Sequence, residues 1–185
     1  GEAYVFDYVG MLGIPLRPSA SLDGDADAAM VSAHALADAD LPEKLTAMIE
    51  AGKPVLLTDG ARRGLGDRIP SAPNVVDLPV RGEPRSLLDL PADRLSDLRR
   101  AMLAPLRLGL EAPSRLAIYP FGSDVLVVEN FNASPASARL TLPSEGDWRV
   151  ALTIPHSKTV EAIPTERGCE LNLPARTAAL LRREA

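Results

Sequence analysis

The residues that could do chemistry in this chain gather around the end of one short apolar run. Residues 54–57 (Pro-Val-Leu-Leu) predict a buried strand, and Thr58 and Asp59 follow it directly. His34 closes an earlier apolar run, residues 28–33. Because the carboxyl ends of parallel strands share one edge of a sheet, we expect His34, Thr58 and Asp59 at one crevice. A hydroxyl, a carboxylate and an imidazole in one crevice could serve a small-molecule hydrolase.

A structural interpretation of the same three residues is favoured. Thr58 and Asp59 stand at a strand end before a turn, where such side chains accept hydrogen bonds from backbone N–H groups. A carboxylate beside a threonine is not a catalytic pair by itself. We therefore predict no catalytic residue, with His34, Thr58 and Asp59 as the only candidates at this rim, and no cofactor.

Other polar residues receive similar interpretations. Arg62 and Arg63 follow the turn and could bind an anion near a helix N-terminus, although solvated arginines are commoner. The acidic residues of the polar loops are interpreted as surface charges and helix caps, not as a glycosidase pair. These are Asp23, Asp25, Asp27, Asp38 and Asp40. A carbohydrate-binding module would need Trp148 or Tyr119 exposed, but a lone tryptophan on a strand is more often a core residue.

Composition excludes several classes of partner. The chain has 185 residues, of which 46% are hydrophobic, and a formal net charge of −5 without a block of basic residues. This charge makes nucleic acid an improbable partner. One cysteine, Cys169, allows no internal disulfide, and two histidines, His34 and His156, give no metal-binding cluster. No apolar run has the length of a membrane span, so no membrane partner is expected, and we expect a cytoplasmic location.

The first part of the chain, residues 1–108, predicts an α/β domain. Helical spacing covers residues 2–12, 41–51 and 93–103, and apolar runs at 28–33, 54–57 and 74–80 predict strands. Continuous apolar strands that alternate with helices are typical of a parallel sheet covered by helices. In the last helix, Arg94, Arg99 and Arg100 are assigned to a solvated face.

The second part, residues 109–185, predicts an antiparallel β-sandwich. Short runs of alternating apolar and polar residues recur there, separated by turn residues. The expected fold class is therefore α/β plus all-β, with a parallel flavodoxin-like layer followed by a small antiparallel sandwich.

The segment Ala51-Gly-Lys-Pro-Val-Leu-Leu-Thr-Asp-Gly-Ala61 resembles the core of the class I glutamine amidotransferase-like fold. Catalytic members carry a cysteine nucleophile between glycines at this turn, and Thr58 takes that position here. His156 is followed by Ser157 and Lys158 and does not match the family's histidine and glutamate. The same fold without its nucleophile forms the trimerisation domain of certain bacterial β-galactosidases, where a small β domain follows it.

The segment Val127-Val-Glu-Asn-Phe-Asn-Ala-Ser-Pro135 resembles the C-terminal β domains of many glycoside hydrolases. Together the two resemblances imply a non-catalytic accessory or oligomerisation region of a larger bacterial carbohydrate-active enzyme. Its expected partners are an upstream catalytic domain of the same polypeptide and further copies of itself. The chain begins with Gly1, and no strand precedes the helix at 2–12, so either a first strand lies upstream or the sheet is rearranged, and loss of that strand would leave a gap or exposed edges. A small-molecule enzyme and a carbohydrate-binding module remain as alternatives.

Overall fold

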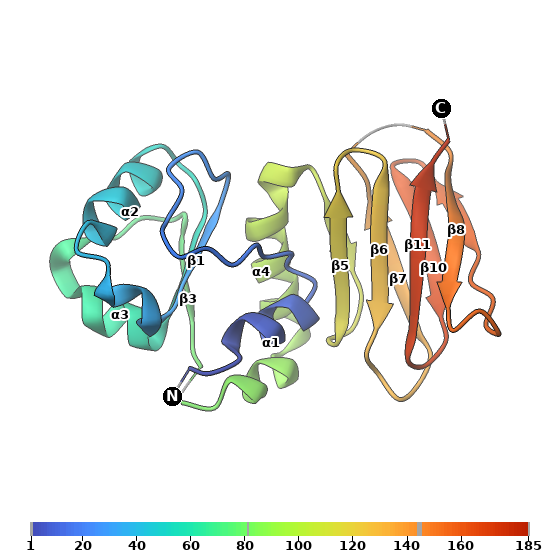
Figure 1. The fold of residues 1–185 in the computed structure, drawn as a ribbon, viewed down its shortest axis with the longest axis horizontal. Helices are drawn as coiled ribbons and strands as arrows, with labels where there is room; N and C mark the ends of the chain where they lie inside the picture. Colours follow the sequence, from blue (N-terminus) through green and yellow to red (C-terminus); the bar gives the residue numbers. More distant parts are fainter. Residues whose placement is uncertain (1, 81, 144–145, 185) are drawn as a thin grey trace. The chain divides into compact units, whose positions relative to one another are not determined.

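The computed structural model describes residues 2–80, 82–143 and 146–184 (Figure 1). The chain forms two compact units. The first comprises Gly1–Tyr8 and Leu16–Asp89, and the second comprises Val9–Pro15 and Leu90–Ala185. The α/β plus all-β fold class is confirmed, because a parallel sheet with helices is followed by antiparallel sheets. By this division the helix at 93–103 groups with the β-rich part. None of the described helices has the length and apolar character that a bilayer crossing requires.

The first unit is built on a three-stranded parallel sheet of order β1-β2-β3. Its strands are β1 (Ala29–Val31), β2 (Val55–Thr58) and β3 (Val75–Leu78). The α-helices α2 (Leu41–Glu50) and α3 (Asp59–Leu65) connect them, and α1 (Val5–Met11) begins in this unit. Three short 3₁₀ helices complete it: η1 (Ala33–Ala37), η2 (Gly66–Arg68) and η3 (Pro84–Asp89). Since Ala29 pairs directly with Val55, the described sheet has no gap.

Burial fixes the position of β2. All four of its residues are buried, and Val55 and Leu57 share one apolar cluster with residues of α2 and α3. The helical members of that cluster are Leu41, Leu45, Met48, Ile49, Ala61 and Leu65. The turn expected after Thr58 continues as α3, although Gly60 and Gly64 are poor helix formers. Tertiary packing therefore holds this helix.

The second unit is a β-sandwich preceded by the helix α4 (Ala92–Leu103) and the 3₁₀ helix η4 (Ala104–Leu106). One sheet has the order β4-β7-β10-β9, with antiparallel pairing. The other has the order β5-β6-β11-β8, also antiparallel (Figure 1). The strands are β4 (Gly109–Glu111), β5 (Leu116–Phe121), β6 (Val125–Asn130), β7 (Ala136–Thr141), β8 (Trp148–Ile154), β9 (Ala162–Thr165), β10 (Gly168–Leu173) and β11 (Thr177–Arg183).

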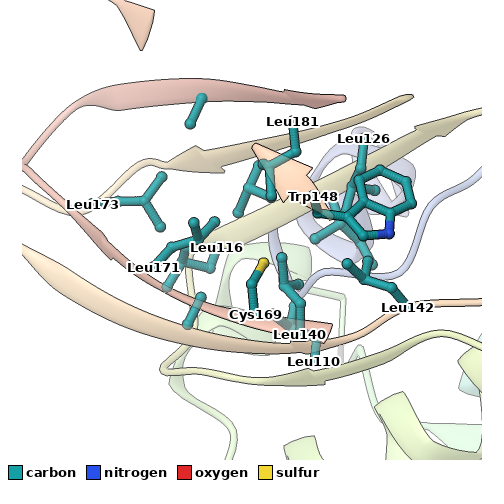
Figure 2. Packing of buried hydrophobic residues seen from close by; sticks show 14 of the residues in the cluster. Leu110, Leu116, Leu126, Leu140, Leu142, Trp148, Cys169, Leu171, Leu173 and Leu181 are labelled. Atoms are coloured by element: carbon teal, nitrogen blue, oxygen red, sulfur yellow. The ribbon is translucent and has the colours of Figure 1, made fainter. Parts of the chain in front are cut away.

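Alternate residues of the two sheets form the sandwich core (Figure 2). Leucines and valines dominate it, and Trp148 and Cys169 are buried among them. Because water is excluded there, burial raises the pKa of the Cys169 thiol to about 11. The expectation of a buried thiol at Cys169 is therefore confirmed.

Asn130 explains the motif at the end of β6. Its buried side-chain amide donates hydrogen bonds to the backbone oxygens of Ser134 (3.0 Å), Leu173 (3.2 Å) and Pro174 (3.0 Å). Its Oδ1 accepts one from the backbone N–H of Asn132 at 2.9 Å. One side chain thus joins the loop after β6 to the turn between β10 and β11.

The assignment of Arg99 to a solvated face is wrong. This side chain is 2% exposed, and Nε donates to the backbone oxygen of Leu12 at 2.6 Å. The guanidinium also donates to the backbone oxygens of Ala112 and Pro113. Burial lowers the pKa of Arg99 to about 10, so it keeps its charge at neutral pH. Arg99 therefore ties α4, the segment after α1 and the start of the sandwich together within the second unit.

Arg99→Met is expected to lower the free energy of unfolding of the second unit by about 2–4 kcal/mol, because three carbonyl groups lose their donor. Urea unfolding followed by Trp148 fluorescence measures this, since Trp148 lies in the core of the second unit. Arg100→Met is the matched control: its side chain is 76% exposed, and its ion pair with Asp97 is worth at most about 1 kcal/mol. Equal effects of the two changes would contradict the assigned role.

The Cys169 thiol is expected to react with Ellman's reagent at pH 8 at least about a hundredfold more slowly in the folded than in the unfolded chain. The raised pKa means that the folded state keeps the proton. Its stabilising effect is complete below the unfolded thiol value of about 8.5 and is lost as the pH rises towards 11. Cys169→Ala should remove that part of the alkaline decline, and similar rates in both states would place the thiol at the surface.

Candidate functional site

The candidate site lies where β2 ends. Thr58 is fully buried, is the N-cap of α3, and accepts a hydrogen bond at Oγ1 from the backbone N–H of Ala61 at 3.1 Å. Its hydroxyl donates to Oε2 of Glu2 at 2.8 Å. The capping interpretation therefore describes Thr58 correctly, and both hydrogen bonds of its hydroxyl are internal.

The carboxylate of Glu2 is the centre of this corner. Besides the Thr58 hydroxyl, it accepts the backbone N–H of Ala33 at 2.6 Å and that of Gly60 at 3.0 Å. Glu2 is only 8% exposed. Ala33 begins η1 and Gly60 lies in the first turn of α3, and the N-terminal ends of helices favour a negative charge. Glu2 therefore joins the N-terminal segment to the ends of two strands.

Two glycines leave room for this arrangement. A Cβ on Gly60 would lie 2.2 Å from Oε1 of Glu2, and one on Gly64 would lie 2.2 Å from Cδ1 of Leu36. Since neither glycine has a positive φ, it is close approach and not backbone strain that requires them. One face of α3 thus accepts Glu2 and η1.

Asp59 has a different role from Thr58. Its Oδ1 accepts the backbone N–H of Val80 at 3.1 Å, and Oδ2 lies 3.7 Å from the guanidinium of Arg63. Asp59 therefore connects the start of α3 to the loop after β3.

His34 does not join the corner's hydrogen bonds. It lies on η1 next to Ala33, its side chain is exposed, and it makes no hydrogen bond or ion pair within the described part of the chain. The partners of the Thr58 hydroxyl are Glu2 and Ala61. The structure thus gives the Thr58 hydroxyl the Glu2 carboxylate as its acceptor, and not His34.

The remaining candidates have structural partners or lie elsewhere. Arg62 pairs with Asp77 at 2.8 Å, and a hydrogen bond from Lys44 lowers the pKa of Asp38. A groove of about 260 Å³ belongs to the second unit, with Trp148 among its lining residues. Within residues 2–80, 82–143 and 146–184, no group of three His, Cys, Asp or Glu side chains could hold a metal ion.

Sequence reasoning missed Glu2, which it assigned to an ordinary helix start. Its partners lie 31, 56 and 58 positions away, so no local pattern marks it. The one available signal in the sequence was Gly60, a glycine just after the end of a predicted buried strand, residues 54–57.

Comparison with known proteins gives a family likeness for the first part only. A family model described as "Uncharacterized protein SSO3021, second domain" matches residues 1–78, which is less than half of the chain. No curated protein matches the chain.

Two solved structures resemble it at low identity. One is α-amylase from H. orenii, with 13% identity, a TM-score of 0.30, and coverage of 85% of this chain and 49% of that one. The other is the apo exo-carrageenase GH42 from Bacteroides ovatus, with 10% identity, a TM-score of 0.31, and coverage of 97% and 26%. The chain thus spans about half and about a quarter of these two, and neither TM-score supports a shared fold.

Gly60→Ala is expected to lower the free energy of unfolding of the first unit by about 1–3 kcal/mol, because the new methyl meets the Glu2 carboxylate. This opposes the gain of about 1 kcal/mol that alanine brings to a helix. In a Glu2→Ala chain the cost should shrink by at least about 1 kcal/mol. Calorimetry and amide exchange at Ala33 and Ala61 measure the free energy of unfolding of four chains: the wild type, the two single variants and the double variant.

Gly10→Ala is the matched control, because a Cβ there meets nothing within 4 Å and Gly10 also lies in a helix. It should be neutral or stabilising with or without Glu2. An equal cost of Gly60→Ala in both backgrounds would show that the carboxylate does not occupy this corner.

Proposed function

We propose that this chain is a non-catalytic accessory region of a larger bacterial carbohydrate-active enzyme, partnered by an upstream catalytic domain of the same polypeptide. One observation carries the non-catalytic part. The hydroxyl at the position where a nucleophile would stand, that of Thr58, is fully buried and bonded to Glu2 and Ala61.

Acyl transfer at this corner would need three things that converge on one reacting atom. These are a nucleophile, a base to activate it, and free N–H donors for the developing oxyanion. Here the N–H groups of Ala33 and Gly60 are bonded to Glu2, and His34 is not a partner of Thr58. These two N–H groups are therefore not free to bind an oxyanion, and neither partner of the Thr58 hydroxyl is a histidine. Both points agree with the resemblance to an amidotransferase-like domain that has lost its cysteine.

The carbohydrate-active context is supported by the order of the parts and by the β6 motif. An α/β unit precedes a small antiparallel sandwich, and Asn130 gives the Asn-Phe-x-x-x-Pro segment a structural reason. A location in the cytoplasm is part of the same proposal.

Both alternatives are less well supported. A small-molecule enzyme would need His34, Thr58 and Asp59 to converge, whereas Thr58 bonds to Glu2 and Asp59 to Val80, and His34 bonds to neither Thr58 nor Asp59. A carbohydrate-binding module would need an exposed aromatic platform, whereas Trp148 is 6% exposed and Tyr119 is half-buried.

The isolated chain is expected to release no ammonia from glutamine and to cleave no nitrophenyl glycoside above the buffer rate. Thr58→Ala and Thr58→Ser are tested beside it, with circular dichroism to show that each variant folds. Turnover that survives in Thr58→Ser and disappears in a folded Thr58→Ala would overturn the proposal, because it would make the hydroxyl a nucleophile.

A further inference from the structure

The outer face of the sheet β5-β6-β11-β8 carries an apolar row across three strands. Val127 of β6 is opposite Leu180 of β11, and Leu180 is opposite Leu152 of β8. The neighbours of these residues along each strand, such as Val128, Ala179 and Leu181, point into the sandwich core, so the row faces outward. Val127 and Leu180 are half-buried, and Leu152 is 38% exposed. Such an outward row offers an apolar surface to a partner.

Opposite charges flank this row on its two sides. On one side Val125, Arg182 and Arg149 are aligned by the strand register. On the other side the register aligns Glu129, Ala178 and Ile154, and Ile154 is 57% exposed. Arg149 already pairs with Glu184 at 3.2 Å, so the basic charge of this face comes from Arg182 and its acidic charge from Glu129. Aliphatic side chains lie between them.

Glu129 and Arg182 do not pair within one copy. Glu129 is opposite Ala178, and Arg182 lies four residues further along β11, about 13 Å away at strand spacing. Neither side chain has an ion pair within the described part of the chain. Partial burial raises the pKa of Glu129, so this carboxylate is already partly desolvated in one copy.

We propose that this face binds the same face of a second copy of the chain, about a two-fold axis that runs along the Val127–Leu180–Leu152 row. The inference rests on the proposed accessory role and gives it a surface and a partner. Rotation about this axis reverses the strand direction and keeps β6, β11 and β8 each over its counterpart. The three aliphatic residues then meet their own copies, and Glu129 of one copy lies over Val125 of the other, one strand from Arg182.

A second copy fits this face because the face is complementary to itself. A two-fold interface joins the same patch on both subunits, so each basic end must meet an acidic end. The rotation above satisfies this requirement twice, with adjacent strands about 4.8 Å apart for the arginine to span. Two sheets that pack face to face at about 10 Å would cover Leu152 and Ile154 as well.

Charge reversal tests both the partner and the register. Sedimentation velocity on the 185-residue chain is expected to show self-association that weakens at least about tenfold in Glu129→Arg and in Arg182→Glu. Mixing these two variants should restore association, because each like-charged pair becomes an opposite-charged pair in the mixed dimer. Restoration cannot arise within one copy, where the two positions are far apart.

Arg139→Glu is the matched control, since Arg139 is exposed on the other sheet and its reversal should leave association unchanged. A wild-type chain that stays monomeric up to about millimolar concentration would overturn the inference, as would variants that associate like the wild type or a mixture that does not recover. None of these results touches the activity assays of Thr58, so failure of the interface and failure of the non-catalytic role can be told apart.

Discussion

The hydrogen bonds of the Glu2 carboxylate decide what the first unit can be. Three donors from two segments distant in sequence, around Ala33 and around Thr58 and Gly60, converge on this one side chain. A buried carboxylate is costly unless it is bonded in this way, and N–H groups at helix starts are equally in need of an acceptor. The N–H groups thus offset the cost of burying the carboxylate, and the carboxylate supplies the acceptor that these N–H groups need. The same contact engages the N–H groups of Ala33 and Gly60.

Much of the fold could be predicted because it is written in local patterns. The continuous apolar run of β2 reflects burial on both faces of its sheet. The alternation of β6, β7 and β10 reflects burial on one face. The helix α3 escaped prediction because its sequence, with Gly60 and Gly64, has a low helix propensity. Its stability comes from contacts with Glu2 and Leu36, which no window of neighbouring residues contains.

The site was only partly predictable for the same reason. Thr58 as a cap follows from its residue type and position, whereas Glu2 as its partner depends on long-range folding. Arg99 is a different case, since Leu95, Arg99 and Met102 follow the i, i+4, i+7 spacing of one helix face. That spacing indicated burial, but arginine was assigned to the surface because charged side chains are rarely buried. A buried arginine that donates hydrogen bonds to carbonyl groups is an exception to this rule.

The glycine of the strand-to-helix corner bears on how related sequences should be interpreted. In enzymes built on such corners, a glycine beside the nucleophile is taken as a mark of catalysis. Here Gly60 accommodates the side chain of Glu2, so its presence records a steric requirement. Sequences that keep this glycine can therefore be sorted by the residue that ends the strand and by a glutamate near the position of Glu2. On the function proposed above, a chain with threonine and glutamate at these places would be grouped with the non-catalytic members, however well its corner aligns with an enzyme's.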